Sequence, residues 1–505
     1  MERATNLRVK EAVVAQGWWK GELLPVSLFF VLGLLSRIPF QSRILYEHWD
    51  SVNYALATQT FDLRIDQPHP PGYILYVLLG RAVNVITGDP QTSFVWLSVL
   101  FSGLSASAMF LLGSRLFNHR VGVLAAAFLL SSPLFWFLGE VAMPHVLDAF
   151  FVISIALLLH EVEQGRTGFL LPAAFSLGMV TGLRQQTALF LLPLAFYSFR
   201  SVGLKRLALA VFCFALVAIL WLVPLFWLSG GMSEYFQITN TFTSRYRYFD
   251  AVILLLQGDG SALLRNIGRL SRYTAYGWSL AAVPFAAYML RSPGKSLRSL
   301  GGKRGNFLLF WLAPALVFYL FVHMGQQGLI FVFLPVLLLL SAVALSRLVT
   351  GQKLYWAAIG ITVLNGFLFV LAPEYPLGEE KVRLLNRSSM IRQDTHYEEL
   401  VRLVRGNFSP KDTVLMGADW RHVEYYLPEY QVIRLPMPNL EGLDSNGGGG
   451  SATAESLEAA LLAVQGRVAN VVLFDRKLPV VRGTSFEDMK GREGTVLYYL
   501  RQTGV

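Results

Sequence analysis

Two short stretches near the start of the chain carry side chains suited to proton transfer and to binding an anion. Asp50 follows Trp49, and a second stretch that includes His69 runs from Asp66 through Pro71 as Asp-Gln-Pro-His-Pro-Pro. A carboxylate within hydrogen-bond reach of a hydroxyl can act as a general base. A phosphate leaving group instead needs nearby positive charge and hydrogen-bond donors. The alternatives are structural: Asp50 could cap a helix beginning at Ser51, and Asp66 and His69 could be turn residues.

Ionisable side chains beside apolar runs supply further candidates. A charged group at membrane depth is costly, so such a residue is a functional candidate by default. Long basic side chains can also snorkel to the interface, and aromatic-rich segments often form interfacial belts. The third candidate carboxylate is Glu140, and the candidate phosphate ligands are Arg184 and His323. The remaining candidates are Asp148, Arg245 and Arg247.

The spacing of the acids bears on metal binding. A divalent-metal site requires several convergent carboxylates or histidines. Here the acids of the first polar stretch are single and separated, without an Asp-x-Asp pair. We therefore expect no metal ion and no other cofactor, although Asp50, Asp66 and Glu140 could converge in space and hold a divalent ion.

The composition indicates a polytopic membrane protein. The chain is 54% hydrophobic and 15% charged, whereas soluble proteins carry about 25% charged residues. Its single cysteine, Cys213, excludes a disulfide within one chain. Spanning helices need about 20 apolar residues. Eleven candidate spans occur, near 23–40, 94–116, 121–138, 146–161, 168–184, 187–199, 207–229, 276–290, 306–324, 329–348 and 354–372.

The basic residues predict the orientation. Residues 1–372 carry a net charge of +12 and residues 373–505 a net charge of −2, so the positive charge belongs to the apolar part. Basic loops face the cytoplasm. If the short apolar run 72–86 does not span, all five basic clusters fall on one side. These clusters are the N-terminus, Arg115/His119/Arg120, Arg200/Lys205/Arg206, Arg291 to Arg304, and Arg347/Lys353. We interpret this positive charge as belonging to cytoplasmic loops and to contacts with phosphate groups. We expect no nucleic-acid partner.

This orientation defines the expected domains. Residues 1–22 form a cytoplasmic N-terminal segment, and 23–372 form a transmembrane domain in the inner cell membrane. Its outer loops are 41–93, 139–145 and 230–275. Residues 373–505 form a soluble extracytoplasmic domain.

The C-terminal region alternates strand and helix patterns. Strands are predicted at 412–418, 430–435, 469–474 and 495–500, and helices at 420–427 and 454–464. Strands that alternate with helices indicate a small α/β unit. The glycine run within 446–451 predicts a flexible loop. We expect this unit to have a structural or acceptor-guiding role.

The order of these motifs resembles the GT-C superfamily of membrane glycosyltransferases, particularly protein O-mannosyltransferases and lipid A aminoarabinose transferases. The resemblance rests on Asp50, Asp66–Pro71, Gly113–Phe117, the run Ala125–Phe135, and the acidic segment leading to Asp148. It implies a GT-C-like helical fold, a catalytic role for Asp50, and a place for His69 near the lipid phosphate. O-mannosyltransferases have two adjacent acids in the first loop, whereas Asp50 lies between Trp49 and Ser51.

The residues and the resemblance together predict an inverting glycosyltransferase. Its donor would be a sugar on a polyprenyl-phosphate carrier, and its acceptor a hydroxyl of a lipid, glycan or protein at the outer face of the membrane. A carboxylate base with single displacement implies inversion at the anomeric carbon. The alternatives are a transporter or lipid flippase, and a non-catalytic factor of envelope-glycan assembly. A transporter would favour two related halves with mid-membrane charges, and the sequence shows no internal repeat.

Overall fold

The structure is a computed structural model that describes residues 21–46, 48–246, 248–291, 302–372, 385–417, 420–434, 468–474 and 496–499. Its residues group into two compact units. The first comprises Met1–Ser42 and Thr60–Met390, and the second comprises Arg43–Gln59 and Ile391–Val505. The second unit thus contains a short part of the predicted first outer loop in addition to the C-terminal region.

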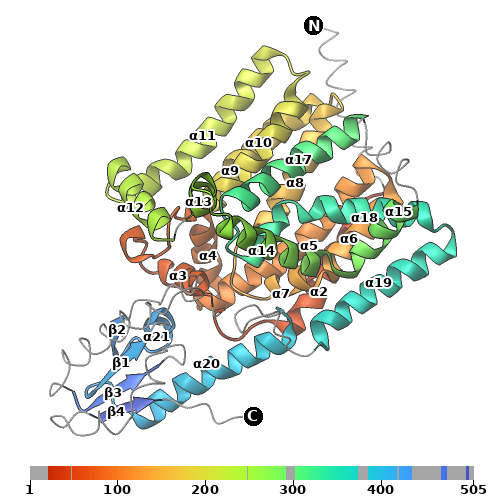
Figure 1. Ribbon diagram of the computed structural model, residues 1–505. Helices are drawn as coiled ribbons and strands as arrows, with labels where there is room; N and C mark the ends of the chain where they lie inside the picture. Colours follow the sequence, from red (N-terminus) through yellow and green to blue (C-terminus); the bar gives the residue numbers. More distant parts are fainter. Residues whose placement is uncertain are drawn as a thin grey trace. The chain divides into compact units, whose positions relative to one another are not determined.

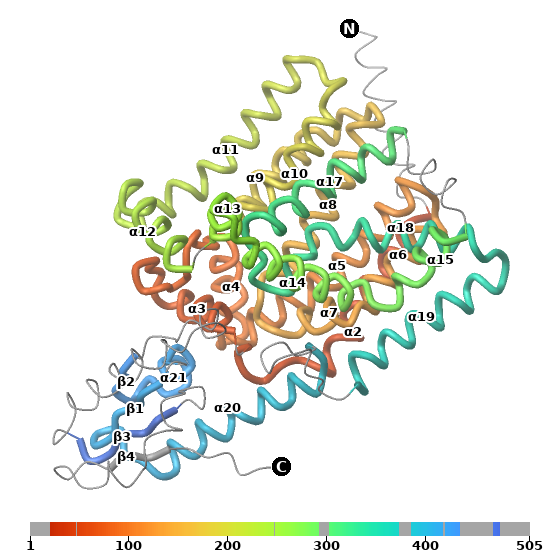
Figure 2. The backbone as a smooth tube through the Cα atoms, in the orientation of Figure 1, coloured from red at the N-terminus to blue at the C-terminus, as the bar shows by residue number. Residues whose placement is uncertain are grey.

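The first unit is helical (Figures 1 and 2). The helices of its first half are α2 (Leu23–Arg37), α4 (Ile74–Thr87), α5 (Pro90–Leu116), α6 (His119–Ser131), α7 (Pro133–Leu138), α8 (His145–Glu163), α9 (Leu170–Leu183) and α10 (Gln185–Phe199). The second half contains α11 (Leu204–Leu228), α12 (Met232–Arg245), α13 (Asp250–Leu256), α14 (Ser261–Trp278), α15 (Ala282–Arg291), α17 (Gly302–Phe321), α18 (Leu334–Leu348) and α19 (Gln352–Val370). Short 3-10 turns lie at Ile38–Phe40, Leu63–Ile65, Thr167–Phe169, Ser279–Ala281 and Gln327–Val332.

Helix α5 is the centre of the first unit and packs against α2, α6 and α8. Small residues permit this close packing, as in other membrane bundles. A Cβ atom at Gly33 of α2 would lie only 2.4 Å from the Cα atom of Gly103 in α5. Any larger side chain at Gly33 would therefore push α2 away from α5.

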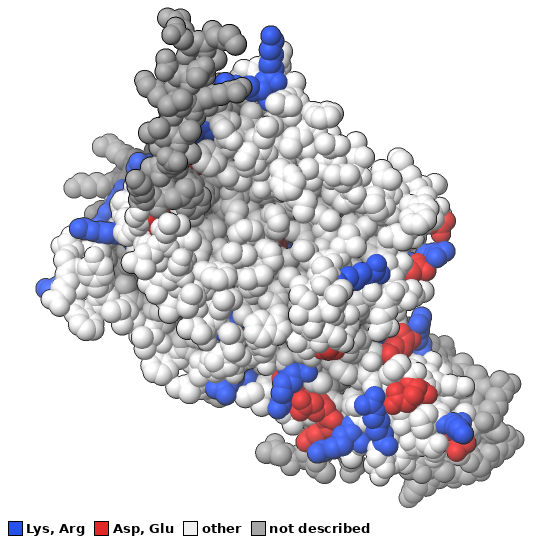
Figure 3. Space-filling view, turned by 180° about the vertical axis from the view of Figure 1, so that it is seen from behind, with Lys and Arg blue, Asp and Glu red and all other residues white. Residues whose placement is uncertain are grey.

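Six helices in the described part of the chain are long and apolar enough to cross a membrane, judged by length and composition. They are α2 with the turn after it (Leu23–Phe40), α5, α8, α11, α17 and α19. Four shorter apolar helical segments are Ile74–Thr87, His119–Ser131, Thr167–Leu183 and Leu334–Leu348. Helix α11 exposes Phe212, Leu220 and Trp227, which would be costly in water but suits contact with lipid. The surface of this unit in Figure 3 is largely uncharged.

Two of the predicted spans are interrupted. The run 121–138 forms α6 and α7, with a break at Ser132 before Pro133, because proline disfavours helical backbone in the preceding residue. The run 276–290 is also not one helix: α14 ends at Trp278, Ser279 adopts a positive φ of 48°, and α15 begins at Ala282. The predicted outer loop 230–275 contains the helices α12, α13 and most of α14, which hydropathy alone does not show.

The second unit contains α3 (Trp49–Ala57), most of α20 (Arg387–Asn407), α21 (Trp420–Tyr426) and a four-stranded sheet. The strands β1 (Thr413–Gly417), β2 (Gln431–Arg434), β3 (Asn470–Leu473) and β4 (Val496–Tyr499) pair in the order β2-β1-β3-β4, and every pairing is parallel. Each strand falls within a predicted segment, and α21 matches the helix predicted at 420–427. The helix predicted at 454–464 and the glycine loop lie outside the described residues.

Candidate active site

The first unit contains a buried charged cluster at the N-terminal ends of α8 and α10. Helix α9 ends at Leu183, and Arg184 has extended backbone (φ −154°, ψ 105°) before α10 begins. Its guanidinium Nη1 lies 3.5 Å from Oδ2 of Asp148, and both residues are less than one-tenth exposed. Thr187 Oγ1 donates a 2.6 Å hydrogen bond to the other carboxylate oxygen of Asp148. A charge pair in this setting stays ionised only because its members neutralise each other.

His145 extends this cluster toward the segment before α18. Its Nδ1 lies 3.2 Å from Arg184 Nη1, and its Nε2 lies 2.9 Å from Oε1 of Gln326. The 3-10 turn at Gln327–Val332 fits against the imidazole of His145 only because residue 328 is glycine. A Cβ atom on Gly328 would lie 2.3 Å from Cγ of His145. Arg184 is therefore held by two side chains of α8, one of which is itself held by Gln326.

A second set of contacts connects this region to the His-Pro-Pro segment. Gln185 Nε2 donates to the hydroxyl of Tyr235, and that hydroxyl donates to the carbonyl oxygen of Pro71. His69 is buried, and its ring stacks on Phe242 of α12 at a centroid distance of 5.7 Å. Helix α12 therefore positions both Pro71 and His69.

The remaining candidate residues of the first unit lie outside the cluster of Asp148, Arg184 and His145. Asp66 ends a 3-10 turn with a left-handed backbone (φ 60°), so its backbone fits the turn role. The ring of His323 stacks on Tyr248 at 4.1 Å. Arg245 is exposed in the last turn of α12, whereas Arg247 lies outside the described residues.

Glu140 is fully buried close to Arg37 at the end of α2. Burial raises the pKa of Glu140 well above its usual range, and the positive charge of Arg37 opposes that rise. Arg37 itself donates to the carbonyl oxygen of Leu130 and lies 4.6 Å from the ring of Trp136. Arg37 is not among the residues predicted from the sequence, although a charged residue at the end of an apolar run is a recognisable signal. The contacts with Leu130 and Trp136 hold Arg37 in place near Glu140.

Asp50 belongs to the second unit, where it is the second residue of α3 and is 3% exposed. Its carboxylate Oδ2 lies 3.6 Å from Nδ1 of His48, the residue before the helix. The backbone N–H of Asp50 donates to the same ring nitrogen at 3.4 Å. His48, and not Asp50, therefore caps this helix.

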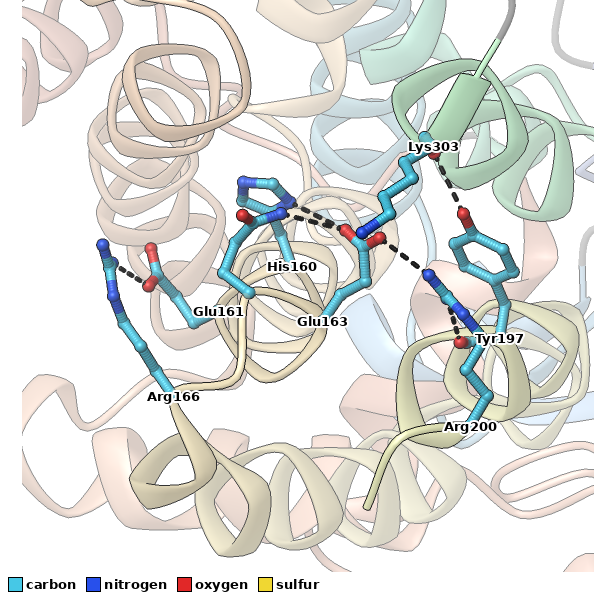
Figure 4. A network of polar contacts seen from close by, with 8 residues as sticks. His160, Glu161, Glu163, Arg166, Tyr197, Arg200 and Lys303 are labelled. Carbon is cyan, nitrogen blue, oxygen red and sulfur yellow. Dashed lines mark hydrogen bonds and ion pairs between the residues drawn. The ribbon is translucent and has the colours of Figure 1, made fainter.

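A further polar network lies at the opposite ends of α8 and α10 (Figure 4). Glu163 accepts a hydrogen bond from Arg200 at 3.1 Å, and its other oxygen lies 3.7 Å from His160 Nδ1. Glu161 pairs with Arg166. The contact of Glu163 with Arg200 joins α8 to α10 at the ends remote from Asp148 and Arg184, so the two helices are connected at both ends.

The described part of the chain contains no group of three His, Cys, Asp or Glu side chains close enough to hold a metal ion. Metal independence stays a prediction.

Comparisons with known proteins find a family match over part of the chain and a shared fold. Residues 68–227 match the family described as dolichyl-phosphate-mannose-protein mannosyltransferase. Among solved structures, ArnT from Cupriavidus metallidurans bound to undecaprenyl phosphate is similar with a TM-score of 0.55 and 11% identity, over 89% of this chain and 92% of that protein. The apo oligosaccharyltransferase of Archaeoglobus fulgidus has a TM-score of 0.49 and 14% identity, over 88% of this chain and 68% of that one. No curated protein sequence matches the chain. The family match is confined to residues 68–227, and the likeness to ArnT, at 11% identity, is a likeness of fold.

Proposed function

We propose that this protein transfers a sugar from a polyprenyl-phosphate carrier to an acceptor hydroxyl at the outer face of the membrane. The observation that carries the proposal is the buried cluster of Asp148, Arg184 and His145 within the segment that matches the family. The ArnT structure with undecaprenyl phosphate bound supports a carrier of this chemical class.

In the proposed reaction the acceptor oxygen attacks the anomeric carbon of the sugar. The bond between that carbon and the phosphate oxygen breaks, and the electron pair leaves with the polyprenyl phosphate. The acceptor proton passes to a carboxylate, for which we propose Asp50. One displacement at the anomeric carbon gives an inverted product.

Cations assist departure of the phosphate because they stabilise the negative charge that develops on it. We propose Arg184 and His69 for this role and His323 as a further phosphate ligand. Asp148 would then hold Arg184 in position, because its carboxylate is the nearest buried counter-charge. The proposal requires no metal ion, so activity should persist in a chelator. Activity lost in chelator and restored by magnesium or manganese would refute this part.

Comparison of Asp50→Asn with Asp66→Asn tests the base. General-base catalysis contributes about 10²–10⁴-fold. Asp50→Asn should therefore lose most turnover at saturating donor while binding the donor normally. An inactive Asp66→Asn together with an active Asp50→Asn would assign the role to the other carboxylate. Full activity in both variants would contradict carboxylate catalysis by either residue.

A further inference from the structure

The segment Arg43–Gln59 is built into the second unit by contacts with residues more than 300 positions later. The backbone N–H of Leu45 donates a 2.7 Å hydrogen bond to the hydroxyl of Tyr426. The backbone N–H of Arg43 donates to Asp394 at 2.9 Å. Ile44 is buried in the same apolar cluster as Leu415 and Val472 of the sheet. The chain that leads into α3 is therefore fixed by this unit.

Helix α3 is held by aromatic and cationic side chains of α21. The guanidinium carbon of Arg421 lies 4.9 Å from the ring of Trp49 and 4.1 Å from the ring of Trp420, so this cation contacts both indoles. Arg421 is only 5% exposed, a setting in which a cation–π contact is strengthened by desolvation. These contacts fix the start of α3 and hence the direction of each side chain along it.

Two polar side chains of α3 have no hydrogen bond with any residue that the structure describes. They are the amide of Asn53, at both its oxygen and its nitrogen, and the hydroxyl of Ser51. Both residues are 0% exposed. A buried polar group without a partner is destabilising, and an apolar group of the same shape would be favoured at such a position. The amide of Asn53 therefore does not stabilise the fold, and its presence points to a role in binding.

The amide of Asn53 lies beside the proposed base. Positions three apart in a helix share a face, with Cβ atoms about 5–6 Å apart. Asp50 and Asn53 have this spacing in α3. An amide can donate and accept at once, which matches a hydroxyl or a pair of neighbouring hydroxyls. A polyhydroxylated ligand next to Asp50 would satisfy both ends of the amide.

We propose that Asn53 is a substrate-binding residue that hydrogen-bonds the hydroxyls of a sugar beside Asp50, with Ser51 as a second contact. The inference rests on the proposed function, because that function supplies the sugar. The sugar is either the one carried by the donor or one in a glycan acceptor, and the experiment below separates these sources. Since the amide is fully covered, a ligand reaches it only if the side chains over α3 move aside.

The test uses the full-length protein with Asn53→Leu, which keeps a similar size and removes the amide. The matched control is Asn407→Leu in the same unit, where the native amide is exposed and donates to the carbonyl oxygen of Leu403. Binding is measured for undecaprenyl phosphate alone and for the same carrier bearing glucose, mannose or arabinose. Thermal stability and hydrogen exchange of the α3 amides are measured in parallel.

In the wild type, at least one sugar-bearing carrier should bind more tightly than the bare carrier and should change exchange in α3. Asn53→Leu should lose that preference by roughly tenfold, as expected for neutral hydrogen bonds. It should bind the bare carrier normally and be at least as stable as the wild type. Unchanged donor binding with a tenfold higher KM for a glycan acceptor would also support the proposal and assign the site to the acceptor.

Three results would overturn the inference. One is a large loss of stability in Asn53→Leu, which would make the amide structural. Another is wild-type binding and KM in that variant. The third is a wild type that prefers none of the sugar-bearing carriers and whose acceptor KM does not respond to Asn53→Leu. A different result would show that the proposed function fails while the inference holds. In that case the protein would bind sugar-bearing carriers preferentially but would transfer no sugar.

Discussion

The pair of Asp148 and Arg184 allows structural and functional roles to be separated by a double-mutant experiment. At 3.5 Å the Coulomb attraction of two unit charges is about 5 kcal/mol for an effective dielectric constant of about 20. The free-energy cost of removing both charged groups from water offsets part of this attraction. Removal of one partner from a buried pair nevertheless costs about 3–5 kcal/mol, because the other charge is left uncompensated.

Arg184→Met should accordingly destabilise the protein by about 3–5 kcal/mol. Adding Asp148→Asn should recover most of that loss, because the double variant contains no unpaired charge and its amide oxygen can still accept from Thr187. Unfolding in detergent, followed for the wild type, both single variants and the double variant, gives the coupling free energy.

Binding of undecaprenyl phosphate should follow a different pattern. A charge-assisted contact contributes about 1.5–3 kcal/mol, so every variant without Arg184 should bind the carrier roughly 10- to 100-fold more weakly. The stable double variant is the decisive sample. Normal carrier affinity in that variant would refute the phosphate role of Arg184, and additive stability losses would refute the pairing.

Three further predictions concern other positions. Because burial raises the pKa of Glu140, the folded protein holds a proton that the unfolded chain releases, so wild-type stability should fall as pH rises above the ordinary carboxyl range. Glu140→Gln should flatten that slope in unfolding measured from pH 4 to 9, and an unchanged slope would contradict the assignment. Tyr426→Phe should destabilise the protein by about 1–3 kcal/mol, because the N–H of Leu45 loses its acceptor; equal stability would be evidence against this anchor. His69→Gln should weaken carrier binding by roughly 10- to 100-fold, and wild-type affinity would discard this contact.

Much of the helical layout could be predicted because apolar runs of helical length are a local property of the sequence. The strands of the small sheet were predictable for the same reason, since each is a short apolar segment between turns. Local patterns fail where the backbone changes direction inside an apolar run, as at Ser132 and Ser279. They also fail for amphipathic helices such as α12 and α14, whose mean hydropathy is low.

The candidate residues could be found from their types, but their groupings could not. Asp148 and Arg184 are 36 positions apart and meet only because α8 packs on α10. The contact of Leu45 with Tyr426 spans 381 positions, so no local pattern associates α3 with the second unit. The buried and unsatisfied amide of Asn53 is likewise visible only in three dimensions.

The transfer reaction itself is tested most directly with purified protein in liposomes that contain undecaprenyl phosphate carrying a radiolabelled sugar. Acceptor fractions from a bacterial envelope are added, and release of the label from the carrier is measured together with its appearance on the acceptor. We predict transfer by the wild type, with loss of most turnover in Asp50→Asn at saturating donor. Movement of the labelled carrier between leaflets without transfer, or equal transfer by Asp50→Asn, would contradict the account.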